Sequence, residues 1–187
     1  MRIAVLNALV AYLPLFVIFC GTADADVLDA EAGGFTTVNE TTIEASRVAV
    51  WQAAITEIDR WWSSDHTVSG EASRLRIDAK PQGCFCEHLG EGAGVVHMTV
   101  TMHNPTVLLR LTGGLGPLGL LGVDGNMTWE FSDADSGTRV KFTYAVGGYR
   151  PGGLDGIASP VDGVIGEALL RLKAHVETGD AERINVE

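Results

Sequence analysis

Apolar residues recur at every second position through the middle of the chain, which is the spacing of one face of a β-strand. The clearest example is Met127, Trp129 and Phe131, and the same alternation continues over 140–146. Each such segment has one apolar and one polar face, so together they predict a sheet that is buried on one side. Strands are expected at 35–43, 74–78, 83–89, 95–102, 107–112, 126–132 and 138–146.

Two segments follow the period of an α-helix instead. Ser46 is a suitable N-cap for a short first helix, whose apolar residues are Val50 or Trp51, Ala54, Ile55, Ile58 and Trp62. A longer helix closes the chain and ends near Gly179; it begins either at Ser159-Pro160 or at about Leu154 with Pro160 inside it. One stripe of that helix is apolar: Ile157, Val161, Val164, Ile165, Ala168, Leu169, Leu172 and Val176.

The apolar face of the sheet and the apolar stripe of the last helix have to be buried against one another. The sequence therefore predicts an α+β fold, in which a curved antiparallel sheet wraps around a long C-terminal helix and a short helical segment follows the first strand. Such an arrangement can enclose a pocket between sheet and helix. We find no internal repeat and expect one domain.

The first residues have the features of an export signal. Arg2 precedes an apolar run over 3–20, and small residues lead up to a cleavage site after Ala25. We therefore expect a signal peptide at 1–25 and a folded domain at 26–187.

An uncleaved membrane anchor is the competing interpretation, because the run approaches the ~20 apolar residues that span a bilayer. Asn7 and Pro14 interrupt the run and favour cleavage, so we expect a periplasmic or secreted protein without stable membrane insertion afterwards. The formal net charge of −11 argues against nucleic acids and anionic membrane surfaces as partners.

Six short motifs are distributed over nearly all of the mature chain: Trp61-Trp62, Gly83-Cys84-Phe85-Cys86-Glu87, Gly113-Gly114-Leu115-Gly116-Pro117-Leu118, Tyr144-Ala145-Val146-Gly147-Gly148-Tyr149, Val161-Asp162-Gly163-Val164 and Arg171-Leu172-Lys173. The chain resembles the START-like helix-grip superfamily (the SRPBCC group) in these motifs. Within it, the resemblance is to a bacterial branch labelled as homologues of a chaperone ATPase activator. The resemblance implies a curved sheet that grips the last helix around a hydrophobic cavity. A cytosolic chaperone role does not fit an export signal.

The stretch Gly114-Leu115-Gly116-Pro117-Leu118-Gly119 has the spacing GxGxxG, which cradles phosphate where it opens a helix. Here a predicted strand follows it, and the chain contains no Gly-Lys-Ser/Thr sequence. We therefore expect a flexible loop at this position, no ATP hydrolysis and no cofactor.

Cys84, Cys86 and His88 alternate on one predicted strand and therefore share a face. If the hairpin loop is the four residues 90–93, His97 lies opposite Cys86, and the thiols and imidazoles form a set that suits zinc or copper. Two thiols without a metal are the simpler interpretation, and a register shift of one residue would separate His97 from them. A Cys84–Cys86 disulfide is a third alternative. Extended residues two apart span about 7 Å between Cα atoms, at the limit of disulfide geometry.

Asp65 and His66 lie in a predicted loop and could act as a general acid–base pair, with Tyr144 as a further proton donor. Two solvated loop side chains are the simpler interpretation. The enzymatic alternative is a cyclase or dehydratase that uses Asp65, His66 or Tyr144, and its turnover should be sensitive to His66→Ala.

We expect instead a binding protein without catalytic activity, whose cavity holds a small hydrophobic or amphipathic molecule. Glycine segments near Gly116 and Gly148 would form the movable lip of this cavity. A metal-binding or redox protein using Cys84 and Cys86 is the other alternative. The expected wall consists of aromatic, methionine and leucine residues: Trp61, Trp62, Phe85, Met98, Met102, Met127, Trp129, Phe142, Tyr144, Leu169 and Leu172.

Overall fold

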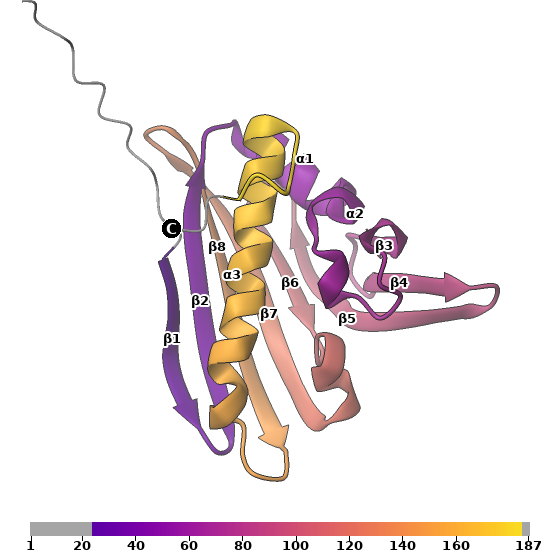
Figure 1. The fold of residues 1–187 in the computed structure, drawn as a ribbon. Coiled ribbons are helices and arrows are strands. Elements are labelled where there is room, and N and C mark those ends of the chain that lie inside the picture. The colour runs from indigo at the N-terminus through magenta and orange to yellow at the C-terminus, as the bar shows by residue number, and fades with distance from the viewer. Residues whose placement is uncertain (1–23, 185–187) are drawn as a thin grey trace, which may run out of the picture.

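A computed structural model describes residues 24–184, in which an antiparallel sheet of eight strands curves around a long helix (Figure 1). The strand order is β1-β2-β8-β7-β6-β5-β4-β3, so β2 pairs with β8 from the other end of the chain. This is the α+β helix-grip architecture that the sequence predicts. The strands are β1 (Asp24–Glu31), β2 (Gly34–Ile43), β3 (Leu75–Ile77), β4 (Cys84–Gly90), β5 (Ala93–Asn104), β6 (Leu108–Thr112), β7 (Gly122–Ala134) and β8 (Gly137–Tyr149).

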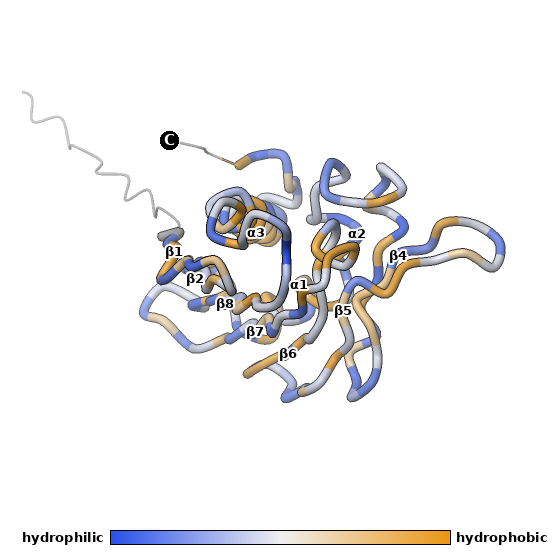
Figure 2. Tube along the Cα trace, turned by 90° about the horizontal axis from the view of Figure 1, so that it is seen from below, coloured by the Kyte–Doolittle hydropathy of each residue, from blue (hydrophilic) through white to orange (hydrophobic). Residues whose placement is uncertain are grey.

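The helices lie on the concave side of the sheet. Figure 2 shows α3 over β1, β2 and β8, while α1 and α2 cover the other half of the curve. The sheet and the helices thus form two layers, with the apolar core between them. The helices are α1 (Arg47–Thr56), α2 (Ile58–Trp61) and α3 (Asp155–Thr178), and short 3₁₀ turns occur at η1 (Ser64–His66), η2 (Ala72–Arg74) and η3 (Gly116–Leu120).

Local sequence signals account for the ends of the helices. The amide nitrogen of Ala49 donates to the Ser46 hydroxyl over 3.3 Å, so Ser46 caps α1 as predicted. Gly179 ends α3 in the left-handed conformation, with φ of 76°, which a glycine adopts without steric cost. Pro160 lies inside α3, which is the longer of the two alternatives for this helix. The proline is tolerated there because the carbonyl that it leaves unpaired belongs to Gly156, an exposed residue.

A chain of aromatic rings runs through the core from one half of the sheet to the other. Trp129 and Phe142 stack with ring centroids 4.6 Å apart, and Trp61 lies 6.0 Å from Trp129. Trp62 continues the chain from Trp61 and contacts Phe85 edge-on at 5.3 Å. These contacts join α2 to β4, β7 and β8, so the short helical segment is an integral part of the core.

The strand β1 is absent from the sequence prediction. It pairs with β2 at the edge of the sheet, and most of its side chains are exposed. Without a buried face it has no alternation of apolar and polar residues that would reveal it. The predicted export signal lies almost entirely at residues 1–23, outside the described residues. No helix within residues 24–184 is long and apolar enough to cross a membrane.

A β-bulge in β5 makes one predicted wall residue wrong. Val100 pairs with Leu111 and Met102 with Arg110, so Thr101 is an extra residue in β5. The bulge reverses the alternation beyond it, and the Met102 side chain, 40% exposed, lies on the outer face instead of lining the interior.

Truncation of the helix stripe should destabilise the fold. Leu169 on α3 is fully buried against the sheet, and we expect Leu169→Ala to lower the free energy of unfolding by about 2–5 kcal/mol because it leaves a cavity. Val48 on α1 is mostly exposed, so Val48→Ala should change the free energy of unfolding by less than about 0.5 kcal/mol. Urea unfolding followed by circular dichroism measures both; equal losses would contradict the assigned role of α3.

Candidate functional site

The inner face of β2 carries a row of polar side chains at the contact with α3. Thr37, Asn39 and Thr41 alternate along the strand and are all buried. The Asn39 amide nitrogen donates to a carboxylate oxygen of Asp162 on α3 over 2.8 Å. The side-chain amide oxygen of Asn39 and the hydroxyls of both threonines have no hydrogen-bond partner within the described residues. Buried polar atoms without partners are rare, because each one costs about 1–3 kcal/mol.

Asp162 supplies an ionisable group to this row. Burial raises the pKa of its carboxyl above the ordinary value, the hydrogen bond from Asn39 opposes this shift, and the nearby charge of Asp26 adds to it. The carboxyl group is therefore easier to protonate than an exposed aspartate.

The polar row continues into the aromatic part of the interior. Asn39 is paired in register with Phe142, and Phe142 with Trp129, so these three residues form one line across β2, β8 and β7. The Trp129 indole N–H is also buried without a partner. The interior between the sheet and α3 therefore combines flat apolar walls with polar atoms that are free to bond.

The predicted wall residues other than Met102 are exposed to only 0–3%, and they lie in the same core. Their packing leaves the interior closed in this structure. The polar row was missed by the sequence prediction, although polar residues at Thr37, Asn39 and Thr41, on the inward period between Phe35 and Ile43, were the signal that could have found it.

The glycine-rich segment 113–121, which we call the lip, lies against Tyr144. The Tyr144 hydroxyl donates to the carbonyl oxygen of Gly113 over 2.9 Å and accepts from the Leu115 amide over 3.0 Å. Burial raises the pKa of Tyr144 to about 12, against the effect of the Leu115 hydrogen bond and together with the charge of Asp124. The hydroxyl is thus held neutral and fully engaged, which does not suit a proton donor in catalysis.

The second predicted lip position, Gly148, lies within a paired strand. Residues 147–149 belong to β8 and pair with β7, and the Gly148 amide also donates to the Gly33 carbonyl oxygen over 3.2 Å. Gly125 on β7 has a packing role, because a Cβ atom there would lie 2.6 Å from the Tyr144 ring. Of the two predicted lip positions, Gly116 therefore lies outside the strands and Gly148 lies within β8.

Asp65 and His66 do not form the predicted acid–base pair. Asp65 is exposed, and the His66 Nε2 lies 3.2 Å from a carboxylate oxygen of Glu167 on α3. The His66 carbonyl accepts from the Trp62 indole over 3.1 Å, so the loop packs onto the aromatic core. This arrangement positions the loop and leaves Asp65 in solvent.

The four metal candidates are divided between the two faces of the hairpin formed by β4 and β5. Cys86 pairs with Val96, so His97 is the extra residue of a bulge and turns inward, away from the cysteines. The hairpin turn also differs from the prediction, because residues 90 and 93 pair and leave a turn of two residues. Within residues 24–184 no group of three or more His, Cys, Asp or Glu side chains is arranged to hold a metal ion.

Cys84 and Cys86 form a disulfide in this structure. Their Cα atoms are 5.4 Å apart, closer than in a regular extended strand, because the ladder is irregular between Phe85 and Cys86. Of the three alternatives for these cysteines, the structure contains the third.

The turned-in His97 forms a buried hydrogen bond with Glu87 that the sequence did not predict. Its Nε2 lies 2.9 Å from a carboxylate oxygen of Glu87, and both side chains are almost fully buried. The Glu87 carboxylate also accepts from the backbone amides of Val68 and Ser69. Burial alone would raise the pKa of Glu87, but the hydrogen bonds from Ser69, Val68 and His97 outweigh it and lower the pKa to about 2.

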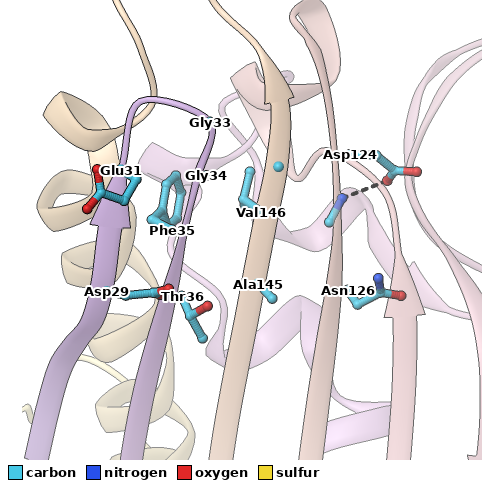
Figure 3. Close-up of a pocket in the computed structure, with 12 residues that line it drawn as sticks. Asp29, Glu31, Gly33, Gly34, Phe35, Thr36, Asp124, Asn126, Ala145 and Val146 are labelled. Atoms are coloured by element: carbon cyan, nitrogen blue, oxygen red, sulfur yellow. Dashed lines mark hydrogen bonds between the residues drawn. The ribbon is translucent and has the colours of Figure 1, made fainter.

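A shallow groove of about 520 Å³ lies on the opposite side of the sheet, over β1, β2, β8 and β7 (Figure 3). It forms where Gly34 pairs with Gly147, because the two glycines leave the outer face without side chains. The carboxylates of Asp29, Glu31 and Asp124 border it. An acidic, open surface of this kind does not suit the apolar ligand that the interior predicts.

The low pKa of Glu87 makes the free energy of unfolding depend on pH in the acid range. Because its pKa falls from 4.5 to about 2 on folding, its contribution is present above pH 4.5 and is lost as the pH falls through 2. We expect the free energy of unfolding to fall by roughly 3 kcal/mol across this window. Glu87→Gln should remove this part of the slope in urea titrations, whereas Glu91→Gln at the exposed hairpin tip should retain it. An unchanged slope in Glu87→Gln would refute the assignment.

Removal of the Tyr144 hydroxyl should loosen the lip. Tyr144→Phe deletes both hydrogen bonds to residues 113 and 115, and we expect hydrogen exchange at the Leu115 amide to accelerate about fivefold to tenfold. Tyr149→Phe is the matched control, because that ring is exposed on the same strand. Mass-spectrometric hydrogen exchange of the two variants measures the difference, and equal rates would show that the hydroxyl does not hold the lip.

Solved structures with this fold include three that are only distantly similar in sequence. A conserved protein of unknown function from Enterococcus faecalis has a TM-score of 0.58 and 16% identity, covering 88% of this chain and 82% of that one. An uncharacterised protein from Rhizobium leguminosarum has a TM-score of 0.55 and 19% identity, covering 84% and 98% of the two chains. DynU16, a protein of the dynemicin biosynthetic locus, has a TM-score of 0.54 and 16% identity, covering 79% of this chain and 49% of its own.

No curated protein is significantly similar to this chain. The family model described as polyketide cyclase/dehydrase and lipid transport matches residues 35–177, which include strands β2 to β8 and nearly all of α3. The predicted START-like superfamily is thereby confirmed. The match spans most of the chain and ends within the helix that the sheet grips, and the protein therefore belongs to the polyketide cyclase/dehydrase and lipid transport family.

Proposed function

We propose that the protein binds a small amphipathic molecule between the inner face of the sheet and α3. The observation that carries this proposal is the set of buried polar atoms without partners beside an aromatic wall, namely those of Thr37, Asn39, Thr41 and Trp129. A bound molecule with polar groups at the same depth would satisfy these atoms and recover their desolvation cost.

The polar atoms define what the ligand has to offer. The free oxygen of Asn39 accepts only, the Trp129 indole donates only, and the threonine hydroxyls do either. Asn39 and Trp129 are separated by Phe142 on the neighbouring strand. The ligand therefore carries a hydrogen-bond donor and an acceptor on a flat or flexible apolar body.

The lip is the entrance in this proposal. The interior is closed, so a ligand enters only if a segment moves, and residues 113–121 connect β6 to β7 without strand pairing of their own. Leu118 inserts into the core while the neighbouring Pro117 and Leu120 remain exposed. The segment can open by withdrawing one apolar side chain and breaking the Tyr144 contacts.

The family supports the chemical class of the ligand. Its description names lipid transport and polyketide cyclisation, both of which concern hydrophobic molecules with polar groups. DynU16, which shares the fold, belongs to the dynemicin biosynthetic locus. A lipid-like or polyketide-like molecule is therefore the ligand that we propose, and the predicted export signal supports the periplasm or the extracellular space as the place where it is bound.

A cyclase or dehydratase is the second candidate, because the family description names both reactions. The buried Asp162, whose pKa is raised by burial, is a better placed proton donor than Asp65, His66 or Tyr144. Asp162→Asn retains the size of the side chain and an oxygen that can accept a hydrogen bond, but the amide cannot act as a proton donor in acid catalysis. Turnover lost in this variant while binding is preserved would establish the enzyme.

Replacement of one unpaired hydroxyl by a methyl group tests the binding site. Thr37→Val should raise the free energy of unfolding of the ligand-free protein by about 1 kcal/mol, because it removes an unsatisfied buried group. The same change should weaken the binding of 1-aminoanthracene, a flat apolar amine, about fivefold when measured by fluorescence. A gain in stability coupled to a loss of affinity is the signature of a ligand-binding hydroxyl.

Thr143→Val is the matched control, because Thr143 lies on the outer face of β8 and should affect neither quantity. Native mass spectrometry of the same proteins, purified from the exported fraction of the host, shows whether an organic molecule is retained. The proposal would be refuted if the parent protein, Thr37→Val and Thr143→Val bound 1-aminoanthracene with equal affinity and retained no organic molecule.

A further inference from the structure

The disulfide between Cys84 and Cys86 lies on the outer face of the β4–β5 hairpin, which extends away from α3 (Figure 1). Phe85 and Glu87, the residues that alternate with the cysteines, are buried on the inner face. The disulfide is thus separated by the sheet from the interior where we place the ligand. Cys84 is partly exposed, whereas Cys86 is 5% exposed.

The bridge contributes little to holding the fold together. It joins residues only two apart in one strand, whereas the stabilisation by a disulfide in the chain-entropy model increases with the length of the loop that it closes. Both residues are already fixed by the ladder, Cys84 opposite Thr99 and Cys86 opposite Val96. The position of this disulfide therefore favours a chemical role over a structural one.

A cation lies beside Cys86, the less exposed of the two cysteines. Arg76 on β3 is the cross-strand partner of Cys86, so the two side chains share a face, and His88 follows two residues later on that same face. Arg76 forms no ion pair within residues 24–184. The negative charge of Glu87 is on the other face, where His97 and two backbone amides already bind it. A positive neighbour stabilises a thiolate, so Cys86 is the better leaving group of the two.

A cavity of about 170 Å³ adjoins Cys86. Its polar border comes from Arg76, His88 and Glu87, and its apolar side from Ala93, Val95 and Val96. The Glu87 carboxylate is bound by His97 and by the backbone amides of Val68 and Ser69, which leaves Arg76 as the cation without an acidic partner at this cavity. This combination suits a small molecule with a short apolar part and a carboxylate.

We propose that Cys84 and Cys86 form a thiol–disulfide exchange site for small thiols that carry a carboxylate. The thiolate of the first thiol attacks Sγ of Cys84, a new S–S bond forms, and the Cys84–Cys86 bond breaks with its electron pair on Sγ of Cys86. A second thiolate then attacks the sulfur of the first in the mixed disulfide. The products are the disulfide of the two small thiols and the reduced pair Cys84 and Cys86, which has gained two electrons and two protons.

The test uses the protein purified from its host with glutathione, which carries carboxylates, and 2-mercaptoethanol, which does not. After a brief reaction and acid quenching, peptide mapping should find glutathione on Cys84 and a free thiol at Cys86. Arg76→Gln should lower the ratio of the rate constants for glutathione and 2-mercaptoethanol about threefold to fivefold, the factor of one exposed ion pair. Arg110→Gln, which changes an exposed arginine on β6, should leave the ratio unchanged.

Single cysteine variants test the assignment of the two sulfurs. With oxidised glutathione, Cys86→Ser should form the mixed disulfide at least about tenfold faster than Cys84→Ser, because only Cys84 is accessible. The double serine variant should unfold at nearly the same urea concentration as the parent protein. A bridge that is inert to both thiols in the folded protein, or a double variant that is strongly destabilised, would overturn the proposal in favour of a structural disulfide. A ratio unaffected by Arg76→Gln would also overturn it.

Discussion

The burial of one face of α3 against the concave side of the sheet is the constraint on which the rest of this structure depends. A single helix covers only part of eight strands, so α1, α2 and the aromatic chain from Phe142 to Phe85 fill the remainder of the curve. The bulges of β5 adapt the far half of the sheet to this filling. Because the helix crosses β2, the polar row on that strand is sealed beneath it, and the site is a consequence of the packing.

Periodicity was sufficient to predict the architecture, and it failed where one residue altered the period. The strands from β2 onward follow from alternation, the start of α1 from its serine cap and the end of α3 from Gly179, and each is present. Thr101 and His97 could not be recognised as bulges, because an inserted residue has no composition of its own. Met102 was therefore placed inside and His97 beside the cysteines, and both assignments were wrong. The edge strand β1 escaped prediction for a different reason, since it lacks a buried face.

The candidate site was predicted in its walls but not in its polarity. Large apolar residues can be recognised in the sequence as part of the interior. The hydrogen-bond partner of a polar residue depends on tertiary contacts that the sequence does not reveal. Asn39 meets Asp162 across 123 residues of chain, and Glu87 meets His97 only because of a bulge. The same limit applies to the cysteines, whose proximity to Arg76 comes from the pairing of β3 with β4. In this fold, strand register therefore decides which polar and reactive side chains lie next to one another.

The two faces of the sheet impose different rules on what each site can bind. On the inner face a molecule has to replace existing core contacts, so affinity depends on how closely it reproduces them and on the cost of opening the lip. On the outer face the disulfide is reached from solvent, and selectivity can come only from neighbouring charge and a small depression. The disulfide lies on the outer face of β4, whereas the Glu87–His97 hydrogen bond joins β4 to β5 on the inner face. Opening of the bridge breaks no contact of the inner face, so binding and thiol exchange can proceed independently.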